Sequence, residues 1–394
     1  MKKYKILFLS SRLPYPPVGG DRLKNYWLLR ILSKHFKINL VSINDQEIPK
    51  DFFDFVNELG LTFKIFQKNK SQCYFNTLKG LATNKLPLQV NYYYFKDIQN
   101  YIDNIYKSHD LLFATLIRTA KYLVGKEKPK ILEITDSIGL NYLRSASKTF
   151  SSKWKTIYLI ERNRLLKFEK YCIEQFDKTL FVNKEERDYF NLPQKTEWLP
   201  NGVDETLFTY EKADPKYKNF VAFLGKMNAQ PNVDAVLWFV KNVLPYLKRN
   251  IKFIIVGAHP PKIIMDLSKK FENVEVTGFV EDPYLILKSS LCVVAPMQTG
   301  GGIQNKILES MALGTINIVS SLAAKPIGAE NGKHFLVCDD AKDMADLINE
   351  IYDNPIKFEY LKKNSREFIK YNFSWSIYER RILDIIDGVL RTYR

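Results

Sequence analysis

The sequence has few cysteines and histidines, four of each among 394 residues. Neither set shows the paired spacing of a disulfide framework or a metal site. We therefore expect reduced thiols, no bound metal and no cofactor. No apolar run of about 18 residues occurs, which argues against a transmembrane helix, and the apolar stretch near the start is too short for a signal peptide. Together these absences predict a cytoplasmic protein.

The chain is long and basic, with 46% hydrophobic residues and a formal net charge of +16. This length is typical of two domains of about 150–200 residues each. A basic protein can bind nucleic acid, an anionic membrane surface or anionic small molecules. No nucleic-acid motif is present, so nucleic acid is not an expected partner. The lysines are spread along the chain, which indicates a broadly positive face or simply lysine-rich usage.

Short apolar stretches alternate with longer helical ones, the pattern of parallel βαβ units in an α/β protein. We expect two Rossmann-like domains facing across a cleft. In the first half, the expected helices are 21–34 and 152–175, and the expected strands are 4–9, 38–43, 61–66, 111–114, 130–135 and 178–182, the last closing the sheet. In the second half, the expected helices are 232–247, 305–313 and 341–353, and the strands are 220–224, 252–256, 274–277, 291–295 and 316–320.

The most informative segment begins with the apolar run 291–295, continues through Gly300, Gly301 and Gly302, and enters a helical pattern. A strand, a glycine turn and a helix start form a phosphate-binding geometry, because free N–H groups converge there. Asn305 and Glu309 share one helix face. Glu309 is expected about seven residues into the helix, roughly 10 Å from its start, where it can reach ribose hydroxyls. The alternative is an ordinary crossover with a solvated glutamate.

The same segment, which continues into Ser-Met-Ala-Leu-Gly314, resembles the donor-site signature of the retaining glycosyltransferases of family 4 (glycosyl transferases group 1). That family carries two glutamates eight positions apart, and here the second is Glu309 while Gly301 occupies the first position. The amino-acid sequence of residues 302–309 is most similar to that of bacterial sugar transferases of exopolysaccharide and surface-glycan assembly. The resemblance implies the GT-B fold, with an acceptor-binding domain at 1–205, a donor-binding domain at 206–371 and a helix at 372–394 that packs back on the first domain.

The resemblance also implies where the donor binds. Lys226 matches a family cation that contacts the diphosphate, but Pro231 stands where a second lysine is usual, and Lys306 is placed to replace it in part. The alternative for Lys226 is a loop lysine in solvent. The resemblance also implies that the backbone of residues 278–280 holds the nucleotide base, and the alternative there is a tight turn that needs glycine. The full set of expected donor-binding residues is Gly225, Lys226, Gly278, Phe279, Val280, Gly301, Gly302, Ile303, Gln304, Asn305, Lys306 and Glu309.

Two segments of the first half are candidates for the acceptor side. Asp136 follows the strand 130–135, at the edge where such sheets bind ligands, and could orient an acceptor hydroxyl or cap a helix. In the family, the loop containing Gly19, Gly20 and Asp21 lies near the donor phosphates and the acceptor, although Asp21 would also make a good N-cap. The expected catalytic residues are therefore Lys226, Glu309 and Asp136.

We expect a reaction that moves a sugar from a nucleotide-sugar donor to a hydroxyl of a lipid-linked glycan, and the resemblance implies that it proceeds with retention and without a metal. The leaving diphosphate would accept the proton. Because Gly301 replaces the first glutamate, backbone amides, Gln298 or Gln304 would bind the sugar hydroxyls. The replacement predicts either altered sugar specificity or an inactive enzyme, and we favour an active enzyme. The open alternatives are a sugar-nucleotide epimerase on the same fold and a non-catalytic nucleotide-sugar or glycan binder.

Residues 86–95 contain four aromatic side chains and precede a lysine. Aromatic and basic residues together suit a membrane interface, here the inner face of the plasma membrane. Tyrosines also pack within buried helices, so this segment predicts either peripheral membrane contact or internal packing.

Overall fold

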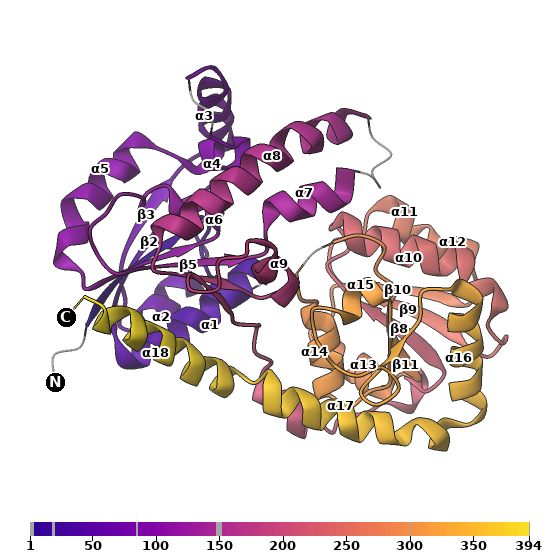
Figure 1. The fold of residues 1–394 in the computed structure, drawn as a ribbon. Coiled ribbons are helices and arrows are strands. Elements are labelled where there is room, and N and C mark those ends of the chain that lie inside the picture. Colours follow the sequence, from indigo (N-terminus) through magenta and orange to yellow (C-terminus); the bar gives the residue numbers. More distant parts are fainter. Residues whose placement is uncertain (1–3, 18–19, 84–85, 147–151, 301, 394) are drawn as a thin grey trace. The chain divides into compact units, whose positions relative to one another are not determined.

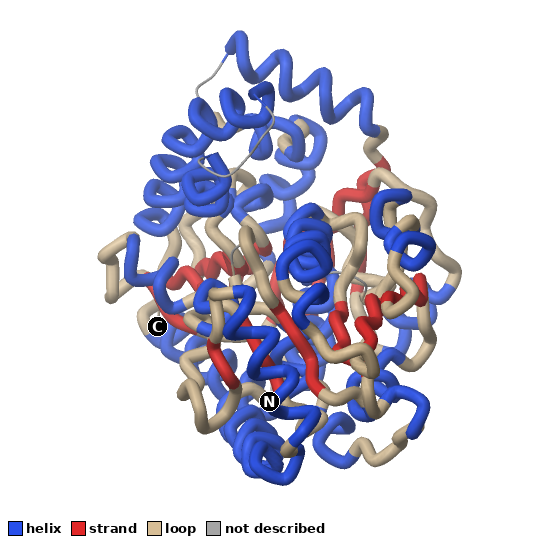
Figure 2. Tube along the Cα trace, turned by 90° about the vertical axis from the view of Figure 1, so that its right-hand side faces the viewer, coloured by secondary structure: helices blue, strands red, loops and turns tan. Residues whose placement is uncertain are grey.

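The computed structural model describes residues 4–17, 20–83, 86–146, 152–300 and 302–393. The chain forms two compact units: Met1–Pro200 together with Glu379–Arg394, and Asn201–Tyr378. We call them the N-terminal and the C-terminal unit. Each contains one parallel sheet covered by helices (Figures 1 and 2). The expected α/β class with two Rossmann-like sheets is confirmed.

The sheet of the N-terminal unit has seven parallel strands in the order β3-β2-β1-β4-β5-β6-β7. The expectation that the strand beginning at Lys178 closes the sheet is wrong, because β7 pairs beyond it. β7 has only three residues, and two of them are polar or charged, so no apolar run announces it. The strands are β1 (Lys5–Ser10), β2 (Lys37–Asn44), β3 (Thr62–Gln67), β4 (Leu111–Thr115), β5 (Lys130–Thr135), β6 (Lys178–Phe181) and β7 (Thr196–Trp198).

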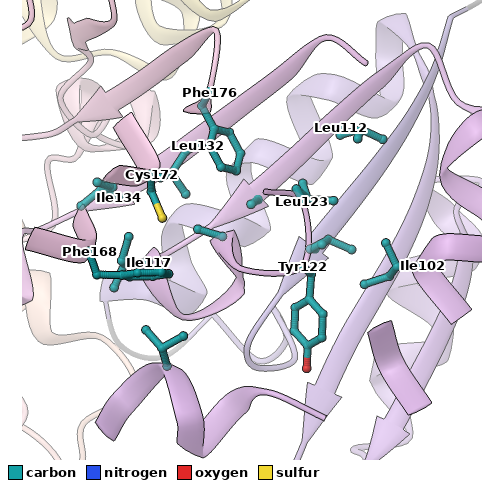
Figure 3. Close-up of a cluster of buried hydrophobic side chains, with 14 of the residues drawn as sticks. Ile102, Leu112, Ile117, Tyr122, Leu123, Leu132, Ile134, Phe168, Cys172 and Phe176 are labelled. Carbon is teal, nitrogen blue, oxygen red and sulfur yellow. The ribbon is translucent and has the colours of Figure 1, made fainter. Parts of the chain in front are cut away.

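Apolar side chains of the central strands and the helices make the core of this unit. β4 is buried along its whole length, as expected for a parallel strand covered on both faces. Figure 3 shows Cys172 of α8, and Phe176 directly after this helix, close to Leu132 and Ile134 of β5. The helices are α1 (Gly20–His35), α2 (Asp51–Glu58), α3 (Lys70–Thr83), α4 (Leu88–Tyr93), α5 (Lys96–Ile105), α6 (Ile117–Ala120), α7 (Ile138–Ala146), α8 (Ser152–Gln175) and α9 (Lys184–Tyr189), with the 3₁₀ turn η1 (Tyr106–Ser108).

The C-terminal unit contains a six-stranded parallel sheet in the order β10-β9-β8-β11-β12-β13. The five expected strands are present, and the two-residue β13 is added at the edge. The strands are β8 (Phe220–Leu224), β9 (Lys252–Val256), β10 (Val274–Gly278), β11 (Cys292–Ala295), β12 (Asn317–Val319) and β13 (Leu336–Val337). The helices are α10 (Gln230–Asn242), α11 (Lys262–Met265), α12 (Leu267–Lys270), α13 (Pro283–Ser289), α14 (Asn305–Ala312), α15 (Ser321–Ala324), α16 (Ala341–Asp353) and α17 (Glu359–Asn372). The 3₁₀ turns are η2 (Glu205–Thr209), η3 (Pro215–Tyr217), η4 (Leu244–Tyr246) and η5 (Pro355–Phe358).

The last helix, α18 (Trp375–Arg391), begins in the C-terminal unit and continues into the N-terminal unit. Within the N-terminal unit, the Glu379 carboxylate lies 2.9 Å from Lys34 Nζ and 2.8 Å from His35 Nε2, both at the end of α1. Arg381 donates to the Trp198 carbonyl. The C-terminal helix therefore contacts the first part of the chain, as expected for a GT-B protein.

The aromatic segment at residues 86–95 packs inward. Val90 and Phe95 are buried in the core of the N-terminal unit, and Tyr92, Tyr93 and Tyr94 pack against it. Tyr122 ties this segment down, since its Oη donates to the Tyr93 carbonyl at 2.7 Å. Of the two alternatives for this segment, membrane contact and internal packing, the structure supports internal packing. None of the described helices is both long and apolar enough to span a bilayer.

Candidate functional site

In the C-terminal unit, β8 lies between β9 and β11, so the chain leaves β8 in one direction across the sheet and β11 in the other. Ligands of doubly wound sheets bind outside the carboxyl ends of the strands at this point. Two loops lie here: residues 225–229, which lead into α10, and residues 296–304, which lead into α14. They carry six of the twelve expected donor-binding residues, and α14 carries three more.

The glycine turn before α14 has the backbone that glycine requires. Gly300 has a φ of 114° and Gly302 a φ of 70°, in the region that side chains disfavour; Gly301 lies outside the described residues. The N–H groups of Ile307 and Leu308 donate to the Gln304 carbonyl, so the N–H groups before them have no acceptor within the helix. An anion placed here would meet these donors and the positive end of the helix dipole.

The position predicted for Glu309 needs correction. The helix begins at Asn305, because Gly302 is left-handed and Ile303 and Gln304 stay outside the helix. Glu309 is therefore the fifth helical residue, about 6 Å from the helix start rather than about 10 Å. It lies closer to the phosphate-binding turn than the sequence indicated.

Lys306 of α14 places a cation beside the glycine turn. Its Nζ donates to Asn232 Oδ1 at 2.5 Å, lies 3.7 Å from Met297 Sδ and stands 4.3 Å from the centre of the Phe223 ring. Among the described residues, no carboxylate forms an ion pair with it. Burial lowers the pKa of Lys306 to about 7, with Glu309 opposing the change. A partly buried ammonium group that has no ion-paired carboxylate is costly, which favours a functional role for this lysine.

Asn232 joins Lys306 to the loop after β8. Its side-chain Nδ2 donates to the Lys226 carbonyl at 3.0 Å, while its Oδ1 accepts from Lys306. Asn232 directly follows Pro231, the position where the family resemblance leads one to expect a lysine. The Lys306 ammonium group is thus held next to the position from which that cation is missing. The Lys226 side chain itself is exposed.

Glu309 is partly buried beside a cation. Burial raises its pKa to about 7, the Lys306 cation lowers it, and the charge of Asp204 raises it further. Among the described residues, no hydrogen bond or ion pair to its carboxylate is present. Asn305, on the same helix face, is fixed by Asn201, whose Nδ2 donates to Asn305 Oδ1 at 2.9 Å. This face therefore offers one fixed amide and one carboxylate that is free to accept hydroxyl hydrogen bonds.

Two further loops lie at the same sheet edge. A Cβ at Gly257, after β9, would lie 1.8 Å from the Gly225 carbonyl oxygen, so glycine is required for the close approach of these loops. Gly278 ends β10 with a φ of 69°, and the following Phe279 is 79% exposed. The conformation of Gly278 is that of a tight turn that needs glycine. Phe279 presents an aromatic ring at the carboxyl edge of the sheet. Val280 follows it, partly buried.

The N-terminal unit has its own change of direction, between β1 and β4. Asn25 of α1 bridges the two strand ends, because its Nδ2 donates to Ser10 Oγ at 3.1 Å and to Thr115 Oγ1 at 3.2 Å. Helix α1 begins at Gly20, so Asp21 lies inside its first turn and the N-cap alternative for Asp21 is wrong. Asp21 instead pairs with Arg12 at 3.4 Å. Gly19 lies outside the described residues.

A buried ion pair stands at the carboxyl edge of β5. Lys24 Nζ lies 3.0 Å from Glu133 Oε1, and both side chains are almost completely inaccessible to solvent. Burial lowers the pKa of Lys24 and raises that of Glu133. Thr135, whose N–H donates to Glu133 Oε1 at 2.8 Å, has a φ of 64°. A non-glycine residue in this conformation is strained, and such strain concentrates at functional sites.

Asp136 follows this strained residue. Burial raises its pKa to about 7, repulsion by Glu186 adds to the shift, and Lys24 opposes it. Its Oδ1 is buried without a hydrogen-bond partner. The helix-cap alternative for Asp136 is wrong, because the cap of α7 is Ser137, whose Oγ accepts from the Leu140 N–H at 3.1 Å. Asp136 therefore has a buried oxygen without a hydrogen-bond partner at the expected edge.

Ser137 is held by two further buried carboxylates. Its N–H donates to Glu186 Oε2 at 2.7 Å and its Oγ to Glu169 Oε2 at 2.6 Å. Arg144 lies 2.7 Å from Glu186 Oε1. Burial raises the pKa of Glu169 to about 7. Within the described part of the chain, no group of three or more His, Cys, Asp or Glu residues is arranged to hold a metal ion.

The structure adds residues that the sequence did not single out, chiefly Asn232, Lys24 and Glu133. The contact between Asn232 and Lys306 could not be predicted from their spacing in the sequence, because the two residues meet only when α10 and α14 pack on adjacent strands. Lys24 lies on a helix, and the sequence alone predicts that a helical lysine is exposed to solvent. The one available signal was Glu133 inside an apolar strand, since a buried carboxylate requires a partner.

Comparison with known proteins agrees with this geometry. Residues 218–354 match the family described as "Glycosyl transferases group 1". A Klebsiella pneumoniae relative, "Uncharacterized 44.6 kDa protein in cps region", is 23% identical over 94% of this chain and 96% of its own length.

Several solved structures share the fold along almost the whole chain. Anabaena HepE, solved in complex with UDP, is 14% identical with a TM-score of 0.66, covering 98% of this chain and 100% of its own. Sucrose-phosphate synthase from Thermosynechococcus elongatus is 14% identical with a TM-score of 0.71, covering 99% and 100%. Residues 218–354 are therefore similar to the glycosyl transferases group 1, and the likeness to the solved structures shows that the chain has the GT-B fold.

Proposed function

We propose that the protein transfers a sugar from a nucleotide-sugar donor to a hydroxyl of a lipid-linked glycan in the synthesis of a bacterial surface polysaccharide. The donor part of this proposal is supported by Lys306 at the start of α14, whose ammonium group is partly buried and forms no ion pair with a carboxylate among the described residues. A diphosphate is the group that suits it, because two phosphates can meet Lys306, Lys226 and the N–H groups of the glycine turn together.

The remaining roles follow from position in the C-terminal unit. Glu309 accepts hydrogen bonds from ribose hydroxyls, and the turn at Gly278 with Phe279 contacts the base. HepE was solved with UDP and with UDP-glucose, so UDP-sugars are the first donors to test. Cations at the diphosphate stabilise the charge that develops on the leaving group. That leaving group takes the acceptor proton, so no strong base is needed.

The acceptor part rests on the N-terminal unit. Asp136 has a free buried oxygen at the carboxyl edge of β5 and orients the acceptor hydroxyl. The relative from a Klebsiella cps region supports a role in surface polysaccharide. These assignments place acceptor binding in the N-terminal unit and donor binding in the C-terminal unit.

An epimerase would need a histidine and a carboxylate together at the ligand edge. His109 and His334 both precede strands, at the opposite edge. His109 is buried and hydrogen-bonded to the Ile105 carbonyl, and His334 accepts from the Glu330 N–H. His259 does follow β9, but no hydrogen bond or ion pair joins it to a carboxylate among the described residues. The arrangement of histidines favours transfer over epimerisation.

A donor screen followed by a transfer assay tests the proposal. A nucleotide-sugar at 100 times its Kd should stabilise the fold by about 2.7 kcal/mol, measured by thermal unfolding with UDP-, GDP- and dTDP-sugars. The stabilising donor is then incubated with lipid-linked glycans, and NMR identifies the anomer formed. Stabilisation without turnover on any acceptor would indicate a non-catalytic binder. Failure of every nucleotide-sugar to stabilise the folded protein would overturn the proposal.

A further inference from the structure

Helix α3 (Lys70–Thr83) presents an apolar face to solvent. Tyr74, Phe75, Leu78 and Leu81 are 60%, 66%, 69% and 56% exposed. Tyr74, Leu78 and Leu81 are spaced by four and three residues, so they share one helix face, with Phe75 beside them. We call these four residues the α3 face. Isolated exposed apolar residues are ordinary, but four on one helix face are a candidate interaction surface.

The opposite side of α3 is fixed to the fold. Cys73 is buried, and a Cβ at Gly80 would lie 2.2 Å from Asn91 Cγ, so this glycine allows α3 to pack closely on α4. Asn76 Nδ2 donates to the Tyr94 carbonyl at 2.8 Å. In Figure 1, α3 projects beyond the sheet and the other helices of the N-terminal unit. The α3 face is therefore held outward by its own packing.

The charges of α3 are all positive. The helix contains Lys70 and Lys79, both exposed, and no aspartate or glutamate. Lysines that flank an apolar face with aromatic residues are typical of helices that lie in the headgroup region of an anionic bilayer. A symmetric contact with a second copy would bring the same lysines toward each other, which charge repulsion disfavours. The net charge of +16 acts in the same direction as the two lysines.

We propose that the α3 face docks the protein on an anionic lipid surface. The helix lies in the interface plane, the four apolar side chains enter the boundary between headgroups and acyl chains, and Lys70 and Lys79 meet lipid phosphates. This binding is independent of sugar transfer and needs no acceptor. It also assigns membrane contact to a different segment from the tyrosine-rich residues 86–95.

Vesicle sedimentation tests the proposal. The full chain is mixed with vesicles of phosphatidylcholine alone, or of phosphatidylcholine and phosphatidylglycerol in equal parts. We expect binding to the anionic vesicles only, weakened about tenfold or more by Phe75→Glu/Leu78→Glu and roughly fivefold for each lysine changed to glutamine in Lys70→Gln/Lys79→Gln. The matched control is Ile356→Glu, because Ile356 is 86% exposed in the C-terminal unit, and it should bind as the wild type does.

A label separates direct insertion from an indirect effect. The four native cysteines are buried, so a polarity-sensitive dye on Leu78→Cys reports α3 alone. Its emission should shift to shorter wavelength with anionic vesicles. Three results would overturn the proposal: no sedimentation of the wild type, equal binding of the Phe75→Glu/Leu78→Glu variant, or a wild-type dimer in size-exclusion chromatography that this variant abolishes. The last result would identify a second copy as the occupant.

Discussion

Lys306 Nζ and Asn232 Oδ1 lie 2.5 Å apart, and this contact joins the start of α14 to the start of α10. The amide holds the ammonium group without neutralising it, so the positive charge remains for a ligand. The group 1 signature lacks its usual second lysine in this chain, because Pro231 occupies that position. We propose that Lys306 supplies this cation instead, from the neighbouring helix.

Asn232→Asp should separate a ligand-binding role of Lys306 from a structural one. The new carboxylate would pair with Lys306, raise its lowered pKa and cancel its charge. We expect nucleoside diphosphate affinity to fall about tenfold or more while the thermal midpoint stays the same or rises. Calorimetric titration and thermal unfolding measure the two effects. Unchanged affinity would show that Lys306 does not contact the diphosphate.

Glu309→Gln should increase stability at the expense of donor binding. The folded protein holds the Glu309 proton up to a pH of about 7, whereas an unfolded glutamate loses it near its ordinary pKa. The unfolded state therefore binds fewer protons in this window, so ionisation of Glu309 lowers stability as the pH rises from about 4.5 to about 7. Above that range, the variant should unfold at a higher temperature than the wild type.

Thermal unfolding at pH 5 and pH 8 measures the effect, and the same samples titrated with the donor report binding. Glu367→Gln serves as a control, because Glu367 lies on α17 of the same unit and has no described role at the site. If Glu309→Gln binds the donor as tightly as the wild type, the ribose assignment is wrong.

Asp136→Asn should slow transfer while leaving donor binding intact. The substitution removes the carboxylate charge and keeps the shape, so loss of an oriented acceptor hydroxyl should lower kcat/KM by roughly 100-fold. Because the pKa of Asp136 is also raised to about 7, the variant should lose less stability than the wild type between about pH 4 and pH 7. Equal transfer rates for the two proteins would remove Asp136 from the acceptor site.

The buried pair Lys24 and Glu133 should show strong coupling. Lys24→Met leaves Glu133 buried without its cation, which should lower the free energy of unfolding by about 3–5 kcal/mol. Lys24→Met/Glu133→Leu removes both charges and should recover most of that loss. Urea unfolding of the single and double variants completes the cycle. Additive losses would mean that the two side chains do not interact in solution.

The sequence predicted most of the fold but only part of the site. Apolar runs such as those of β4 and β9 identify buried parallel strands, whereas β7 and β13 are too short to carry a pattern. The glycine turn and Glu309 were visible because local spacing encodes them. The contact of Lys306 with Asn232 and the pair of Lys24 with Glu133 were not, since each depends on packing between segments distant in sequence.

The most direct test removes the cation at position 306 and places a lysine at position 231 instead. Lys306→Met should weaken binding of a nucleoside diphosphate roughly 10- to 100-fold, because a charged hydrogen bond is lost, and should weaken the matching nucleoside monophosphate much less. Pro231→Lys added to Lys306→Met should restore a large part of the diphosphate affinity, whereas Lys241→Met on the exposed side of α10 should change nothing. Titration calorimetry of the wild type and these three variants gives the Kd values. The account predicts loss and recovery specific to the diphosphate, and equal diphosphate affinity in the wild type and Lys306→Met would contradict it.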